Sequence, residues 1–111
     1  MQIQEQRHGA VTVIRPIGSL ALGEADELRA RLREAVGRSL GRLALDASGI
    51  SYVDSLGLEV LVDMSDELAH GGRCLRVCGA SDLLREVLDL TGLADRFEFY
   101  LDANAAARSF L

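Results

Sequence analysis

The residues of this chain best suited to chemistry are Asp54 and Ser55, which place a carboxylate directly beside a hydroxyl. They follow a strand-like apolar run at residues 43–45 and a loop at residues 46–53, and they open a segment with helical apolar spacing. The first turn of a helix has unsatisfied N–H groups and the positive end of the helix dipole. Such a position can hold a phosphate without any catalyst of its own.

Local chemistry leaves two roles open for each of these residues. Ser55 is either an ordinary N-cap that accepts a backbone N–H or a phosphoacceptor. A phosphoserine carries a charge of about −1.5 to −2, which a helix N-terminus tolerates but a docked apolar or acidic partner surface does not. Asp54 either caps a backbone amide, or orients the Ser55 hydroxyl or a polar group of a partner.

The helix that starts at Ser55 is expected to run to about His70 and to end at Gly71. At about 100° per residue, one apolar stripe faces the core. This stripe comprises Leu58, Leu61, Val62, Ser65, Leu68 and Ala69. A second ridge is predicted at the boundary with solvent and consists of Leu56, Val60 and Met64. This ridge either packs under the neighbouring helix or forms a docking strip for a partner, because exposed apolar patches usually mark interfaces.

The length and composition of the chain exclude several classes of protein and of functional site. A chain of 111 residues is expected to form one domain, residues 1–111, that buries roughly 65% of its unfolded surface. The formal net charge of −5 argues against nucleic acid as a partner. Lysine is absent, which excludes a P-loop, a Schiff base and a phosphoreceiver lysine. No signal peptide or membrane-spanning run is visible, so we expect a cytoplasmic protein without direct membrane insertion.

The sequence offers no set of residues for a metal, a cofactor or catalysis. Cys74 and Cys78 are four residues apart in a predicted strand, which separates them by about 13 Å, too far for a disulfide. The only histidines are His8 and His70, so a metal site lacks ligands. No base lies near Ser55 in the sequence. We therefore expect structural cysteines and a protein that is not an enzyme.

The hydrophobic pattern predicts an α/β fold. The elements follow the order β-β-α-β-α-β-α-β-α, with a first hairpin that is antiparallel and right-handed crossovers that make the rest of the sheet parallel. We expect about five strands and four helices in a single mixed, mostly parallel sheet. Ligand and partner sites of such sheets lie at the carboxyl ends of the strands. The loops at residues 18–23, 46–54 and 79–80 are expected at this edge, together with Ser55.

The segment Ile50-Ser51-Tyr52-Val53-Asp54-Ser55-Leu56-Gly57-Leu58 resembles the signature of STAS domains, specifically the small anti-sigma factor antagonists. Further similarities are Gly18-Ser19-Leu20 after the second strand, the strand at residues 74–78, and Leu90-Thr91-Gly92-Leu93 before the last strand. The resemblance covers nearly the whole chain in the same order. It implies the STAS fold.

In the family that the chain resembles, the serine after the aspartate is phosphorylated by an anti-sigma factor that is itself a serine kinase. The unphosphorylated protein binds that anti-sigma factor and releases the sigma factor, and a phosphatase restores binding after phosphorylation. The resemblance thus implies that Ser55 is the phosphoacceptor and that Gly57 lets a partner approach closely. The expected partner-binding residues are Gly18, Ser19, Leu20, Asp54, Leu56, Gly57, Val60 and Met64.

The chain departs from the family at two positions. The family often has an acidic residue where Ala21 stands, and many members have Ser or Thr where Leu56 stands. Related domains also serve in signalling assemblies and lipid-transport ABC systems, and the fold alone does not determine the role. The alternative function is therefore a STAS scaffold subunit in which Ser55 is never phosphorylated.

Overall fold

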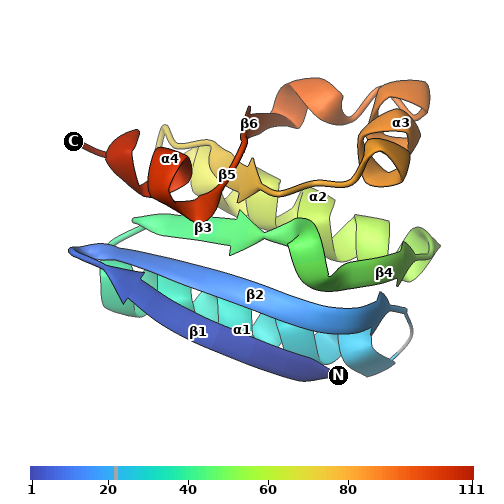
Figure 1. Cartoon of the computed structure of the whole chain (residues 1–111), viewed down its shortest axis with the longest axis horizontal. Helices are drawn as coiled ribbons and strands as arrows, with labels where there is room; N and C mark the ends of the chain where they lie inside the picture. Colours follow the sequence, from blue (N-terminus) through green and yellow to red (C-terminus); the bar gives the residue numbers. More distant parts are fainter. Residues whose placement is uncertain (22) are drawn as a thin grey trace.

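The computed structural model describes residues 1–21 and 23–111 and shows a mixed sheet with helices on both faces (Figure 1). The strands are β1 (Gln2–His8), β2 (Val11–Leu20), β3 (Leu43–Asp46), β4 (Ile50–Val53), β5 (Leu75–Cys78) and β6 (Phe97–Tyr100). The helices are α1 (Gly23–Ser39), α2 (Ser55–His70), α3 (Asp82–Leu90) and α4 (Ala103–Arg108). Two short 3-10 turns, η1 (Ala47–Gly49) and η2 (Ala94–Arg96), precede β4 and β6. The predicted α/β class is confirmed.

The strand order is β1-β2-β3-β5-β6, and among the described residues the β1–β2 hairpin is the one antiparallel pair. The predicted loop at residues 46–53 contains a sixth strand, because β4 pairs in parallel with the last residues of β2. β4 is only four residues long and has one strand neighbour among the described residues, so no long alternating pattern marks it in the sequence. Likewise β2 extends to Leu20 through the start of the predicted 18–23 loop.

β2 connects the two ends of the molecule. Its first half pairs with β3 at Thr12–Ile14, and its last residues pair with β4 at Gly18–Leu20. Pro16 lies between these two pairings, where β2 changes its parallel neighbour and the missing N–H is least costly. With ten residues, β2 spans roughly 30 Å. The longest dimension of the molecule is 32 Å.

The main core lies between the sheet and the helices α1, α2 and α3. Side chains alternate between the faces, so Ile14, Leu43 and Leu45 join this core while Val13 and Ala44 point to the other face. The other face is covered by α4 through Ala106 (Figure 1). The sheet and its two helical layers thus hold the start of α2 at one end of the molecule. No helix among residues 1–21 and 23–111 is both long and apolar enough to cross a bilayer.

Candidate functional site

The candidate site is the start of α2, where Ser55 is the first helical residue and is exposed. The N-cap of α2 is Asp54, whose Oδ1 accepts a hydrogen bond from the Gly57 N–H at 2.9 Å. The prediction of a capping carboxylate at Asp54 is confirmed, and the alternative that Ser55 itself caps the helix is wrong. Among the described residues, the Ser55 hydroxyl forms no hydrogen bond. It is therefore free for modification or for a partner.

The head of α2 is held against the end of β2 by backbone contacts. The Asp54 N–H donates to the Leu20 carbonyl at 3.3 Å. Gly57 is buried beneath this contact, and a Cβ at Gly57 would overlap the Leu20 carbonyl oxygen and lie 2.9 Å from Leu20 Cγ. The close approach of α2 to Leu20 at the end of β2 thus explains why a glycine is needed at position 57. The interpretation that Gly57 makes room for a partner is not needed, and its burial places it out of direct reach.

The predicted solvent-facing ridge on α2 is wrong for two of its three residues. Val60 and Met64 have exposed fractions of only 1% and 0%, and both belong to the main core. The buried face of α2 is Gly57, Val60, Leu61, Met64, Ser65 and Leu68. Gly57 lies at the centre of this buried face, but glycine has no side chain and adds nothing to the apolar pattern. The face predicted from apolar periodicity is therefore rotated by nearly a quarter turn about the helix axis from the observed one. Val60 and Met64 share this core with Leu28 and Leu32 of α1, so for these two residues the alternative that the ridge packs under a neighbouring helix is confirmed.

The other predicted partner-binding residues divide by exposure. Leu56 is 42% exposed beside Ser55, and Ser19 is exposed at the end of β2. Gly18 is half-buried with a φ of 116°, in the region that favours glycine. Leu20 is fully buried, so its predicted direct contact with a partner is wrong. It supports the site from below, because its carbonyl anchors Asp54.

Two grooves flank the head of α2. A predominantly apolar groove of about 240 Å³ lies between β4 and α3 and is lined by Tyr52, Val53, Leu83, Leu84 and Val87, among others. Tyr52 and Leu83 are largely exposed there. Another groove of about 390 Å³ lies between the heads of α1 and α2, where Asp26, Leu56 and Glu59 meet. Val53, two residues before Ser55, lines the first groove, and Leu56, the residue after Ser55, lines the second, which is otherwise mainly charged.

Tyr52 and the α3 leucines are absent from the sequence-based site prediction. Tyr52 lies on the unrecognised strand β4, and Leu83 is almost thirty positions away from Ser55 in the chain. The sequence gives one local sign of this groove. Leu83 is a leucine that lies off the buried face of α3, which is formed by Leu84 and Leu88. Such an exposed leucine is common on protein surfaces, so the sequence alone does not mark it.

The charges around the site are mainly acidic. Asp26, Asp54 and Glu59 form no ion pair within the described part of the chain, whereas Arg29 pairs with Asp63 at 2.9 Å. The two histidines are far away, since His70 ends α2 and His8 ends β1 beside the hairpin turn. The described residues contain no cluster of three or more ligands for a metal ion. The arrangement suits docking and modification of an exposed hydroxyl.

Both cysteines are predicted to be structural core residues, and this is confirmed for Cys78, whereas Cys74 is only partly buried and lies outside the core clusters. Both cysteines are free, and Cys78 is fully buried. Burial, followed by the nearby charges of Asp46 and Asp102, raises the pKa of the Cys78 thiol to about 12. Burial also raises the pKa of Cys74, whose Sγ lies 3.2 Å from the Arg96 carbonyl oxygen. Neither thiol is activated as a nucleophile.

The sequence and the fold are similar to those of known proteins. The STAS domain profile matches residues 2–106. An anti-sigma F factor antagonist from Paenibacillus polymyxa is 27% identical over 94 residues, which cover 84% of this chain and 80% of the relative. An anti-sigma factor antagonist structure from Mycobacterium paratuberculosis has a TM-score of 0.82 and 22% identity, with 97% and 92% of the chains covered. The structure of the phosphorylated Bacillus cell fate determinant SpoIIAA has a TM-score of 0.72 and 20% identity, with 97% and 99% covered. Because the profile matches nearly the whole chain, this protein belongs to the STAS domain family.

Proposed function

We propose that this protein is an anti-sigma factor antagonist that binds an anti-sigma factor through the head of α2 and thereby releases a sigma factor. Phosphorylation of Ser55 by a serine kinase activity of that partner ends the binding, and a phosphatase restores it. The observation that carries the proposal is the exposed Ser55 hydroxyl at the first position of α2, unbonded among the described residues and flanked by exposed apolar side chains. The function named for the Paenibacillus relative supports it.

The surface around Ser55 explains how a phosphate would act. Leu56 is exposed next to Ser55 in the chain, and Tyr52 is exposed on β4 three residues before it, so a partner docked over this area would remove water from it. A phosphoserine of about −1.5 to −2 charges would have to be desolvated beside these apolar groups and beside the carboxylate of Asp54. That cost falls on the complex alone, because in the free protein the phosphate stays hydrated.

The helix tolerates the same modification. Asp54 already occupies the cap and Gly57 N–H, so phosphorylation of Ser55 displaces no hydrogen bond among the described residues. The remaining first-turn N–H groups and the helix dipole favour a negative charge at this position. The modification is therefore expected to change binding while the fold is retained.

The contact surface that we propose consists of Gly18, Ser19, Asp54, Ser55 and Leu56. Leu20, Gly57, Val60 and Met64 lie beneath it and hold its shape without touching the partner. The two flanking grooves extend the surface on either side of Ser55. No catalytic step, cofactor or nucleic acid is assigned to this chain.

The test is binding of the cognate anti-sigma factor by isothermal titration calorimetry, with wild type, Ser55→Asp and Ser55→Ala. We expect Ser55→Asp to weaken binding at least about tenfold, equivalent to about 1.4 kcal/mol, while Ser55→Ala binds like wild type. Gln6→Glu is the matched control, because it adds one negative charge on exposed β1, remote from α2. Equal affinity of Ser55→Asp and wild type would refute the switch.

Phosphorylation is tested separately by intact mass after incubation with the anti-sigma factor and ATP. Wild type should gain the mass of one phosphate, and Ser55→Ala should gain none. Binding of the anti-sigma factor without any mass gain would instead support a constitutively binding protein. Absence of both binding and modification would support a scaffold role in another assembly and would overturn the proposal.

A further inference from the structure

The charges of this protein are separated between its two ends. Seven of the twelve arginines pair with a carboxylate in residues 1–21 and 23–111. Of the other five, four lie at the end where the β1–β2 turn and α4 meet. These four are Arg7, Arg42, Arg73 and Arg108. At the opposite end, Asp26, Asp54 and Glu59 lack a cationic partner within the same residues.

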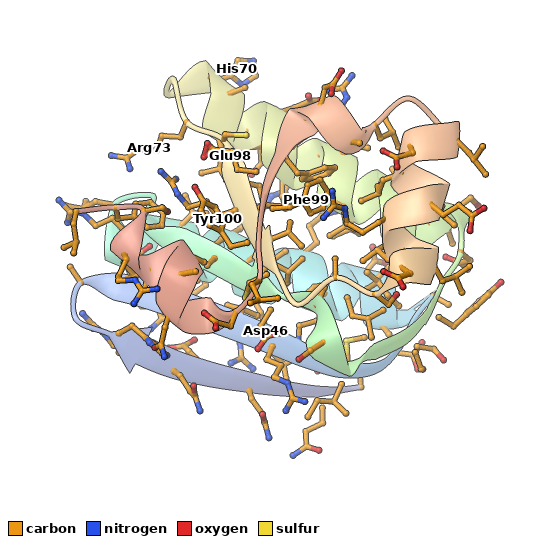
Figure 2. The ribbon with its side chains drawn as sticks, turned by 45° about the horizontal axis from the view of Figure 1, so that its top comes forward. Asp46, His70, Arg73, Glu98, Phe99 and Tyr100 are labelled. Carbon is orange, nitrogen blue, oxygen red and sulfur yellow. The ribbon has the colours of Figure 1, made fainter. Side chains whose placement is uncertain are left out.

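The basic end contains a groove, here called the basic groove, of about 350 Å³. Its rim carries His8, Arg42 and Arg108, and its floor includes Val11 and Phe110. Arg73 adds charge nearby, because its side chain packs over Gly41, the residue before Arg42 (Figure 2 shows Arg73 at the same end as His70). The volume is roughly ten times the ~30 Å³ share of one water in the liquid, which leaves room for an apolar side chain.

The opposite end offers a matching shape and charge on this same chain. Leu56 lies beside Ser55 and is exposed, and Asp26 and Glu59 line the same groove as Leu56. Arg29 also lines this groove, but its charge is paired with Asp63 at 2.9 Å, so the unpaired charges there are acidic among the described residues. An apolar side chain bordered by acids complements an apolar floor bordered by arginines. β2 runs from Val11 in the basic groove to Leu20 under the head of α2, so the two surfaces are roughly 30 Å apart and cannot meet within one molecule.

We propose that a second copy of this chain inserts Leu56 at the head of α2 into the basic groove of the first. In the contact, Asp26 and Glu59 of one copy face Arg42 and Arg108 of the other. The interface is heterologous, so each copy retains one free head and one free basic groove and the association continues head to tail. It also covers Ser55 of every copy except one in each chain of molecules.

The inference rests on charge, shape and exposure, and it does not depend on the proposed function. Its consequence for that function is competition, because the same head surface would serve the anti-sigma factor. Self-association is measured without any partner protein. Its failure would therefore leave the proposed anti-sigma factor binding untouched, and failure of that binding would leave self-association untouched.

The experiment uses two variants that each disable one end. Arg42→Gln with Arg108→Gln neutralises the basic groove and leaves the head intact. Asp26→Asn with Glu59→Gln neutralises the head and leaves the groove intact. All four side chains lie on the surface and are replaced by uncharged amides, so circular dichroism melts are expected to match wild type. Sedimentation velocity over a concentration series gives the oligomeric state.

We expect wild type to form species that grow with concentration and each variant alone to associate at least about tenfold more weakly, since two facing charges are lost. A one-to-one mixture of the variants retains a single native contact, so it should stop at a dimer. Arg85→Gln is the control, because this arginine also lacks a carboxylate partner among the described residues but lies over Phe99, outside both surfaces. It should associate like wild type.

Three results would overturn the inference. Wild type could remain monomeric at millimolar concentration, where contacts of this size would be populated. A dimer unaffected by either double variant would indicate a different, two-fold interface. A mixture of the two variants that associates no better than each variant alone would show that the head of α2 and the basic groove do not contact each other.

Discussion

Replacement of Gly57 by alanine tests how the candidate site is built. The added Cβ would overlap the Leu20 carbonyl oxygen, lie 2.9 Å from Leu20 Cγ and lie 3.0 Å from Val53 Cγ1. The first of these atoms belongs to the backbone that anchors Asp54, so rotamer changes cannot relieve the overlap. Overpacking of this kind typically costs about 1–3 kcal/mol. The start of α2 would have to move away from β2.

Gly37→Ala is the matched control for this substitution. Gly37 is also a helical glycine, in α1, but a Cβ added there would meet no atom of residues 1–21 and 23–111 within 4 Å apart from its own stretch of helix. Alanine should therefore stabilise the protein by up to about 1 kcal/mol through helix propensity. The two identical chemical changes are expected to shift stability in opposite directions.

Urea and thermal unfolding followed by circular dichroism measure both effects. Gly57→Ala should lower the free energy of unfolding, and at about 4–8 °C per kcal/mol its midpoint temperature should fall by several degrees. Gly37→Ala should leave it equal or higher. If Gly57→Ala were as stable as Gly37→Ala, the close approach of α2 to Leu20 would be wrong. The explanation of Gly57 by internal packing would then fail, and a role in partner contact would regain its basis.

Three further predictions concern the cap, the corrected face of α2 and the buried thiol. Asp54→Ala should lower the unfolding free energy by about 1 kcal/mol, whereas Asp54→Asn, which can still cap, should change it by less; equal losses would exclude capping. Met64→Ala should lower the unfolding free energy by about 2–5 kcal/mol and Leu56→Ala by far less; a small loss at Met64 would restore the exposed ridge. Because the pKa of the buried Cys78 thiol is raised in the folded state, its contribution to the unfolding free energy should be complete below the unfolded-state pKa of 9.0 and should be lost as pH rises toward about 12. Urea unfolding of Cys78→Ala should lack this part of the pH dependence.

Much of the fold follows from local sequence patterns. The bounds of α2 were predicted at Ser55 and His70, because its apolar periodicity is long and Gly71 and Gly72 follow it. The start of α3 is marked by Ser81, a residue type that favours the N-cap, and its hydroxyl accepts the Leu84 N–H at 3.1 Å. β4 was not predicted, since a four-residue strand with one neighbour leaves only a weak pattern.

The candidate site shows the same division. Asp54 and Ser55 stand out in the sequence because a carboxylate and a hydroxyl at the start of a helix have local chemical consequences. Which face of α2 is buried depends instead on how closely β2 approaches Gly57, a residue without a side chain to signal it. Likewise, the grooves around Leu56 and Arg42 combine residues from segments far apart in the chain. Their positions follow from the packing of helices on the sheet, which only the tertiary structure decides.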